Sequence, residues 1–300
     1  MIGLRSKRIL TDSIIYIVLA VMVVIWLFPL FWMISRAFDV ETSASKAGGL
    51  VFPAEWTWTN FRNLFPGGPG KLDVVTGKYV ADYKNHPYGT WLLNTFGVAL
   101  GSCVITTLFV LMVSYALSRL KFNSRKKLMN IALILGLFPG FLSMIALYYI
   151  FKQFNLTDSL VGLTLAYSLA SGTGYYIVKG FFDTVPLAID EAARIDGATK
   201  NRIFWTMIIP LSKPIIVYTI LTSFISPWCD YIMASVFISD TTKKTVAVGI
   251  RAWIADRELV SGYFARFCAG GVLISVPIVI LFLVMQKFYV TGITGGAAKG

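Results

Sequence analysis

Long apolar runs without charge constrain the fold of this chain more than any other feature. Five windows contain no Asp, Glu, Lys, Arg or His: residues 13–35, 91–118, 128–151, 159–178 and 267–285. A sixth, residues 215–239, contains one charged residue, Asp230. At roughly 1.5 Å per residue, helices of these lengths approach or exceed a hydrocarbon core of about 30 Å. With only 14% charged residues, the sequence predicts an all-α integral membrane protein with six transmembrane helices.

Basic residues in the short segments predict the orientation of these helices. The loop 119–127, "RLKFNSRKK", contains five Lys or Arg and no acid, and the N-terminus contains Arg5, Lys7 and Arg8. The excess of Lys and Arg in cytosolic loops therefore predicts cytosolic N- and C-termini. Most of the net charge of +12 is then explained by the basic residues that orient the helices in the membrane. The charge therefore gives no indication of nucleic-acid binding, and a general attraction to anionic lipid is the remaining effect expected from it.

The first apolar window is expected to be retained as a helix. It is longer than the roughly 7–15 apolar residues of a signal-peptide core, and "RAFDVETSASK" after it offers no convincing cleavage site. The three cysteines lie in apolar windows and are expected to be small buried hydrophobes: Cys103, Cys229 and Cys268. The single histidine, His86, is expected to be solvated in an outer loop.

A charged segment, residues 184–214, interrupts the apolar windows. Thr184 is predicted to cap a short helix over 186–195, and Gly197 suits the left-handed conformation that ends such a helix. Thr199 is predicted to cap a second helix over about 200–209, which Pro210 stops. Two short helices that meet at a glycine are expected to form a compact knuckle.

The first of these helices is predicted to be amphipathic. Ile189, Ala192, Ala193 and Ile195 form its apolar or small side, which is expected to lie against the transmembrane bundle. Its charged side consists of Asp190, Glu191 and Arg194, with Glu191 and its neighbours expected to face the cytosol. From these residues alone, a solvated connector without further function remains an alternative.

The knuckle resembles the EAA loop of permease subunits in bacterial ABC importers. "EAARIDG" followed by "IIP" matches the motif of that loop at Glu191, Ala192, Ala193, Gly197 and Pro210. Met207 and Ile209 replace its usual Ile and Leu, and both are volume-conserving changes. The stretches "FPAEWTWTNFRNLF", "YALSRLKFNSRKKL" and "VTGITGGAAKG" resemble sugar permeases of the maltose type, specifically the six-helix partner of the heterodimer.

The resemblance implies a type I ABC importer permease, a multi-pass protein of the bacterial cell membrane. It implies four segments: the cytosolic N-terminus and first helix 1–35, the extracytoplasmic loop 36–90, the transmembrane core 91–290 with its coupling loop 180–214, and the cytosolic tail 291–300. It also implies contact with a cytosolic ATPase through these residues: Asp190, Glu191, Ala192, Ala193, Asp196, Gly197 and Pro210.

The same resemblance implies that the chain is not itself an enzyme. It contains no GxxxxGK[ST] phosphate loop, and it is expected to bind no cofactor or metal directly. The expected partners are a second permease subunit, two ATPase subunits that bind ATP and Mg, and an extracytoplasmic substrate-binding protein. The expected cargo is a sugar, with an oligosaccharide favoured and an acidic one not excluded.

Asp230 is the ionisable residue inside a predicted span. A charge near the bilayer centre costs roughly 2.5–3.5 kcal/mol on insertion scales, so Asp230 is expected to face a cavity or a partner. Its aromatic neighbours suit sugar rings, which makes Trp228, Asp230 and Tyr231 candidates for the substrate pathway. The competing interpretation is a structural hydrogen bond at the kink of Pro227.

Two other classes of function remain open as alternatives. One is a secondary transporter or channel, which would need charge relays or ion sites within the spans, and Asp230 alone is a poor candidate for these. The other is a membrane-embedded enzyme whose metal ligands would be Asp190, Glu191 and Asp196, although these carboxylates are not expected to converge on one helix face.

Overall fold

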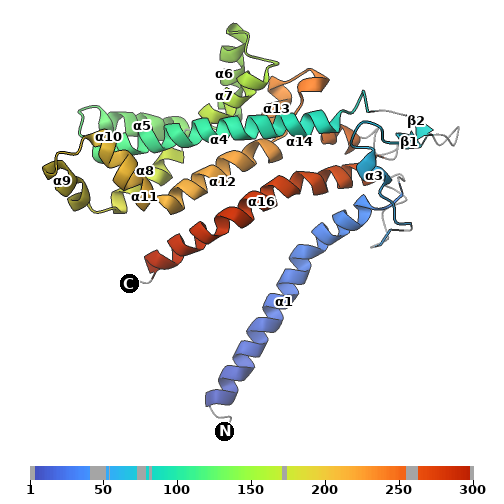
Figure 1. Cartoon of the computed structure of the whole chain (residues 1–300), viewed down its shortest axis with the longest axis horizontal. Helices are drawn as coiled ribbons and strands as arrows, with labels where there is room; N and C mark the ends of the chain where they lie inside the picture. The colour runs from blue at the N-terminus through green and yellow to red at the C-terminus, as the bar shows by residue number, and fades with distance from the viewer. Residues whose placement is uncertain are drawn as a thin grey trace. The chain divides into compact units, whose positions relative to one another are not determined.

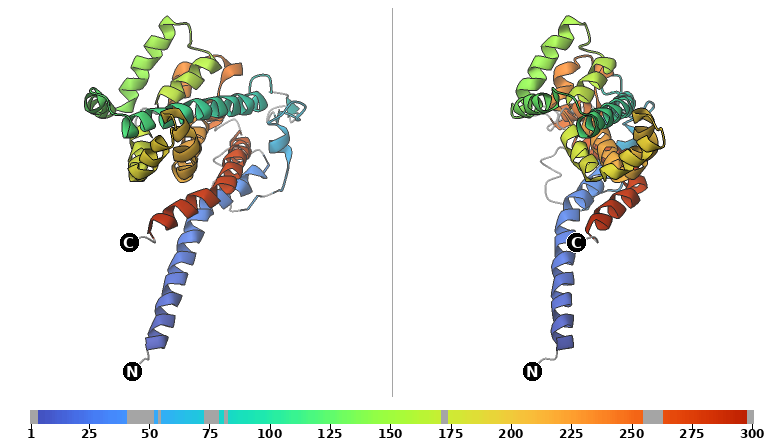
Figure 2. Two further views of the ribbon diagram at one scale, coloured as in Figure 1. Left: turned by 60° about the vertical axis from the view of Figure 1, so that its left-hand side comes forward. Right: turned by 90° about the vertical axis from the view of Figure 1, so that its left-hand side faces the viewer.

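The computed structural model describes residues 4–40, 52–53, 55–72, 79–80, 83–170, 174–254 and 263–297. Helices dominate these residues (Figure 1 and Figure 2). They form two compact units, one from residues 1–87 with 252–273 and the other from residues 88–251 with 274–300. The candidate sites lie in the second unit.

The first unit begins with α1 (Leu4–Ala37), which contains Pro29, and continues with α3 (Thr59–Arg62). Strands β1 (Lys71–Leu72) and β2 (Tyr79–Val80) pair antiparallel. Asn60 ties α3 to the end of α1, because its amide donates hydrogen bonds to the carbonyl oxygens of Ala37 at 3.0 Å and Asp39 at 2.6 Å.

The second unit is built around α4 (Tyr88–Arg119), which packs against α7, α8 and α12. The buried residues of α4 recur every three or four positions, as in Trp91, Thr95 and Val98, which is the period of a helix face. The other helices of the unit are α5 (Arg125–Gly136), α6 (Gly140–Gln153), α7 (Leu160–Ala170), α8 (Gly174–Thr184), α9 (Leu187–Ile195), α10 (Lys200–Ile203), α11 (Ile209–Leu211), α12 (Lys213–Cys229), α13 (Ile232–Phe237) and α14 (Val246–Arg251). The long C-terminal helix α16 (Phe264–Ala297) belongs to both units.

Three shorter helical turns complete the described elements. A π-helical turn covers Phe204–Ile208, and two 3₁₀ turns cover Thr241–Lys243 and Ala252–Ile254.

Helices α4 and α7 approach each other closely at Gly101 of α4 and Thr164 of α7. A Cβ atom added to Gly101 would lie 2.9 Å from Cγ2 of Thr164, so the glycine allows the two helices to approach. Gly97 lies one helical turn before Gly101, and a Cβ atom added to it would meet no atom within 4 Å.

Three helices among the described residues are long and apolar enough to cross a membrane: Thr11–Ala37, Tyr88–Arg119 and Phe264–Phe288. Two bent pairs raise this number to five if each is one span, namely Arg125–Gly136 with Gly140–Gln153 and Lys200–Leu211 with Lys213–Cys229. The six-helix count and the cytosolic position of both termini stay predictions, and residues 171–173 of the window 159–178 lie outside the described residues.

The window 128–151 is not one straight helix, as a simple span would be. α5 and α6 bend by 103° at a break that contains Pro139. Proline has no backbone N–H and disfavours helical geometry in the residue before it, which accounts for a break at this position.

Two minor expectations from the sequence are wrong. Cys103 and Cys268 are buried, but Cys229, the last residue of α12, is exposed. His86 is partly buried and packs in an aromatic group, with ring centroids 5.3 Å from Tyr263 and 6.1 Å from Trp253.

Candidate coupling loop and membrane cavities

The first helix of the knuckle, α9, begins directly after Pro186. Pro186 occupies the N-cap position with φ −56° and ψ 132°, without a side-chain cap. Thr184 was expected to cap this helix, but its hydroxyl donates to the carbonyl oxygen of Phe181 at 2.7 Å. Thr184 therefore belongs to the end of α8, because a neighbouring carbonyl satisfies its hydroxyl.

The junction of the two short helices has the predicted geometry. Gly197 adopts φ +79°, a left-handed conformation that residues with a side chain rarely adopt. The amide of Ala198 donates back to the carbonyl oxygen of Ala193 at 2.9 Å and closes the end of α9. Thr199 caps α10, because its hydroxyl accepts from the amide of Arg202 at 3.3 Å.

The second short helix is longer than predicted. After α10 the chain continues through the π-helical turn Phe204–Ile208 into α11. Pro210 lies inside α11 and does not stop the helix. The break comes at Ser212, where the chain turns by 83° into α12.

The faces of α9 differ from the prediction. Ile195 was assigned to the bundle side, but it is 87% exposed, and Ala192 is exposed as well. Asp190 was grouped with the cytosolic charges, but it is only 2% exposed. The helix is therefore rotated so that one acidic residue points into the protein and one large apolar residue points out.

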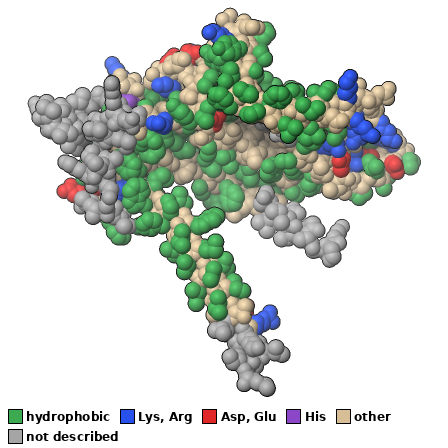
Figure 3. Space-filling view, turned by 180° about the vertical axis from the view of Figure 1, so that it is seen from behind, with side chains coloured by type: hydrophobic (Ala, Val, Ile, Leu, Met, Phe, Trp, Pro, Cys, Tyr) green, Lys and Arg blue, Asp and Glu red, His purple; other side chains and the backbone are tan. Residues whose placement is uncertain are grey.

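The expected coupling residues divide into two groups. Glu191, Ala192, Asp196, Gly197 and Pro210 are exposed, whereas Asp190 and Ala193 are buried. Seen from behind, charged side chains gather at the end of the second unit that carries α9 and α10 (Figure 3). The exposed group thus provides a mixed charged and apolar surface.

Asp190 lies beside a basic residue of α4. Its Oδ2 atom is 3.1 Å from Nε of Arg119, and both side chains are almost completely buried. Arg119 also donates from Nη2 to the carbonyl oxygen of Val185 at 2.7 Å. A buried carboxylate requires such a partner, because removal from water disfavours an isolated charge.

This arrangement contradicts the metal-centre alternative. Asp190 points inward while Glu191 and Asp196 are exposed, so the three carboxylates do not converge. Within the described residues, no group of three or more His, Cys, Asp or Glu side chains could hold a metal ion.

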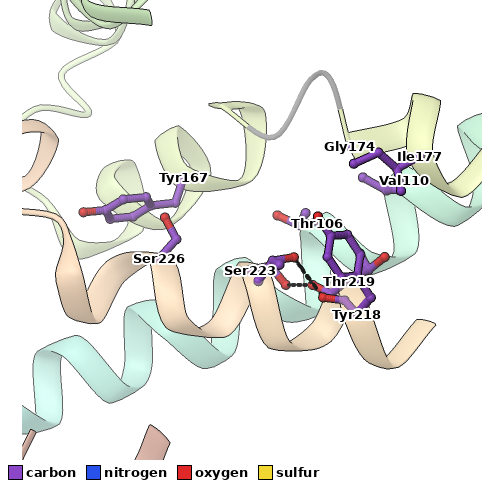
Figure 4. A pocket seen from close by; sticks show the side chains of 10 residues that line it. Thr106, Val110, Tyr167, Gly174, Ile177, Tyr218, Thr219, Ser223 and Ser226 are labelled. Carbon is purple, nitrogen blue, oxygen red and sulfur yellow. Dashed lines mark hydrogen bonds between the residues drawn. The ribbon is translucent and has the colours of Figure 1, made fainter. Parts of the chain in front are cut away.

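A cavity of about 260 Å³ lies among α4, α7, α8 and α12 (Figure 4). We call it the hydroxyl cavity because most of its lining residues carry a hydroxyl group. These residues are Thr106, Val110, Tyr167, Gly174, Ile177, Tyr218, Thr219, Thr222, Ser223 and Ser226. The described residues that line it carry no formal charge.

Hydroxyl groups of this cavity donate to carbonyl oxygens of their own helix, α12. Thr219 donates to the carbonyl oxygen of Ile215 at 2.8 Å, and Ser223 donates to that of Thr219 at 2.6 Å. Their oxygen lone pairs remain for other donors. Thr106 is 3% exposed, and its Oγ1 atom has no hydrogen-bond partner among the residues that the structure describes.

The hydroxyl cavity was not predicted from the sequence. The available signal was the recurrence of Thr219, Ser223 and Ser226 at helical spacing inside an apolar window. Such residues are often satisfied by the backbone of their own helix, so their spacing alone does not indicate a cavity.

A second cavity of about 720 Å³ lies where α5 and α6 break, next to α7 and α13. Its lining is mainly apolar and includes Asp230. Asp230 follows the last residue of α12, and its Oδ1 atom accepts from the amide of Met233 in α13 at 3.2 Å. Asp230 therefore lines a cavity, and this side-chain hydrogen bond joins it to α13 rather than to the kink at Pro227 that the structural interpretation named.

The structure does not bring the three pathway candidates together. Trp228 is 2% exposed and packs beside Phe224, whereas Tyr231 is 43% exposed with the guanidinium of Arg251 5.9 Å from its ring centroid. Of the three, Asp230 is the one that lines a described cavity.

The chain is similar to known transport proteins. Residues 111–295 match the family model described as binding-protein-dependent transport system inner membrane component. The chain is 32% identical over 297 residues to the maltodextrin transport system permease protein MdxG of Bacillus subtilis (strain 168), covering 98% of this chain and 99% of the relative. It is 29% identical over 300 residues to the galactooligosaccharides transport system permease protein GanQ of the same strain, covering 99% of both.

A solved structure shows the same fold. It is a chain of a bacterial ABC transporter involved in the import of the acidic polysaccharide alginate, with a TM-score of 0.71 and 21% identity. The similarity covers 96% of this chain and 99% of that chain. These matches confirm the resemblance to sugar permeases that the sequence motifs indicated. The chain therefore belongs to the family of binding-protein-dependent transport system inner membrane components, the multi-pass permease subunits of ABC importers.

Proposed function

We propose that this chain forms half of the translocation pathway of an ATP-driven oligosaccharide importer. The observation that carries the proposal is the exposed face of α9, where Glu191 and Ala192 of the EAA motif lie one turn before the exposed Ile195. The relatives support the substrate class, since MdxG is named for maltodextrin transport and GanQ for galactooligosaccharide transport.

The exposed face of α9 suits a cytosolic ATPase as its partner. Ile195 is 87% exposed and Leu187 is 58% exposed, although both are large apolar residues on a short helix. Glu191 stands beside them and can accept charge-assisted hydrogen bonds from a basic partner. Apolar anchors next to a charged residue are typical of a protein interface.

The remaining partners follow from the proposed importer. A second permease subunit would complete the pathway, two ATPase subunits would bind ATP and Mg, and a binding protein would deliver the sugar from outside. The chain itself would hydrolyse no ATP and hold no cofactor.

The hydroxyl cavity favours a neutral sugar as cargo. Its described lining offers hydroxyl oxygens and the unpaired Oγ1 atom of Thr106, which match the donors and acceptors of sugar hydroxyl groups. An acidic sugar would require basic partners, which the described lining lacks. We therefore propose neutral oligosaccharides such as maltodextrins over uronates.

Asp230 is proposed as a pathway residue in the larger cavity. We expect Asp230→Asn to change the transport rate while the subunits still assemble. Loss of assembly would instead assign Asp230 to the α12–α13 junction alone.

Variants of the exposed face test the proposed function. Glu191→Lys reverses the charge of this face, and Gly197→Asp forces a side chain into the left-handed conformation. Both should lower the amount of ATPase that co-purifies with the permease, whereas Lys121→Gln on an exposed basic loop should not. Normal ATPase recovery and normal transport in both coupling-loop variants would overturn the assignment.

A further inference from the structure

The C-terminal end of α4 contacts the coupling loop through three residues of one helix face. The hydroxyl of Tyr115 donates to the carbonyl oxygen of Lys200 at 3.0 Å, at the start of α10. The hydroxyl of Ser118 donates to Oδ1 of Asp183 at 2.6 Å, at the end of α8. Arg119, four residues after Tyr115, contacts the turn before α9 and the helix itself.

The ion pair of Arg119 with Asp190 differs from that of Lys179 with Asp183, which also lies near the loop. The side chains of Arg119 and Asp190 are 2% and 3% exposed, whereas those of Lys179 and Asp183 are 12% and 44% exposed. An exposed pair is screened by water and readily exchanged, but a buried pair leaves an uncompensated charge when it separates. Within the described residues no hydrogen bond joins the two charged groups, so the contact is an ion pair, and separating α9 from α4 would leave both buried charges uncompensated.

The positions of these two residues also favour the ion pair. Arg119 is the last residue of α4, and Asp190 is in the first turn of α9. A cation at a helix C-terminus and an anion at a helix N-terminus are both favoured by the helix dipoles. The guanidinium group also bonds Val185 through a second nitrogen, which a lysine ammonium could not reproduce in the same geometry.

We propose that the Arg119–Asp190 pair is a rigid link that makes α9 and α4 move as one body during the transport cycle. This inference rests on the proposed docking of an ATPase on α9. A displacement of α9 would pass through the link to α4, a continuous helix that also contributes Thr106 to the hydroxyl cavity. Thr106 precedes Arg119 by thirteen residues, a distance of roughly 20 Å along the helix axis. Arg119 and Asp190 are thus positioning residues that connect the ATPase contact to the membrane cavity.

Distance measurements between spin labels can test the link without knowledge of the sugar. One label replaces Met112, an exposed residue of α4, and the other replaces Arg194, an exposed residue on the flank of α9. The native cysteines are first replaced by serine or alanine. The label-to-label distance distribution is recorded by pulsed electron spin resonance in the complete importer, without nucleotide and with MgATP trapped by vanadate.

The proposal predicts different responses from the linked and unlinked proteins. With Arg119 and Asp190 intact, the two nucleotide states should give the same narrow distribution. In Arg119→Gln and in Asp190→Asn, the distribution should shift and broaden when MgATP is trapped. The double variant should respond no more than either single variant, because both substitutions remove one interaction. Lys121→Gln, which removes an exposed charge next to the same helix end, should respond like the intact protein.

Two results would overturn the link. One is a nucleotide-dependent shift in the intact protein, which would show that α9 moves independently of α4. The other is a distribution in Arg119→Gln that is altered equally in both nucleotide states, as a merely structural role would produce.

A parallel arm separates this inference from the proposed function. Ile195→Asp should abolish recovery of the ATPase with the permease. If Ile195→Asp retains the ATPase normally, the docking proposal fails. If Ile195→Asp loses the ATPase but Arg119→Gln responds like the intact protein, the link alone fails.

Discussion

Ile195 provides the sharpest test of the exposed face of α9. The side chain is 87% exposed in this subunit, so a partner that covers it would gain almost its full burial energy. Ile195→Ala removes three carbon atoms, each worth about 0.8 kcal/mol when buried. Scaled by the exposed fraction of 87%, the loss is about 2 kcal/mol, which corresponds to roughly 30-fold weaker binding.

The assay is a titration of the purified ATPase onto the permease in lipid nanodiscs, with the dissociation constant as readout. Ile195→Ala should raise this constant roughly 30-fold without changing the apparent melting temperature of the permease, because the residue is exposed there.

Ile189→Ala is the matched control, since it removes the same three carbon atoms from the same helix. Ile189 is partly buried and packs against the apolar core around α8 and α10. Its truncation should lower the melting temperature but leave the affinity of the folded protein unchanged. The reasoning is refuted if Ile195→Ala changes the affinity less than about threefold, or if Ile189→Ala weakens binding more than Ile195→Ala does.

Two further predictions concern the rest of the second unit. A Cβ atom at Gly162 would lie 1.8 Å from the carbonyl oxygen of Leu156, so Gly162→Ala should cost about 1–3 kcal/mol or more and lower the melting temperature. Gly97→Ala should leave the melting temperature unchanged, because its Cβ atom would meet nothing within 4 Å. Equal melting temperatures for the two variants would contradict the close contact of Gly162 with Leu156. The backbone N–H of Asp240 holds the pKa of Asp158 below its usual value, so this carboxylate stabilises the fold above its unfolded pKa of about 3.9 and loses that effect as the pH falls through the lower folded pKa. Between about pH 5 and pH 3, the melting temperature should therefore fall more steeply with decreasing pH for the native protein than for Asp158→Asn. An equal pH dependence of the two melting temperatures would exclude this contribution.

Local signals made part of the coupling loop predictable from the sequence. Gly197 and Thr199 act through their own backbone and nearest neighbours, so the left-handed turn and the cap of α10 appear where the sequence predicts them. The direction of α9 depends on a distant residue. Arg119 lies 71 positions before Asp190 and attracts its carboxylate inward, which rotates Ile195 outward. No pattern within α9 reveals that partner.

The membrane cavities were less predictable for a related reason. Apolar windows indicate that a helix can cross a membrane, but they do not indicate which helices pack together. Thr106 and Ser223 come from helices far apart in the sequence and meet only in the folded second unit. Pro139 marks the place of the break between α5 and α6, but the local sequence does not specify the bend of 103°.

Uptake into proteoliposomes tests the central claim most directly. The importer is reconstituted with its partner subunits and binding protein, and labelled maltotriose, a galactotriose and a uronate trisaccharide are offered with ATP on the ATPase side. The account predicts uptake of a neutral trisaccharide that requires hydrolysable ATP and is lost in Ile195→Asp. Uptake that continues without ATP, or that follows an imposed ion gradient, would contradict it and identify a secondary transporter or channel.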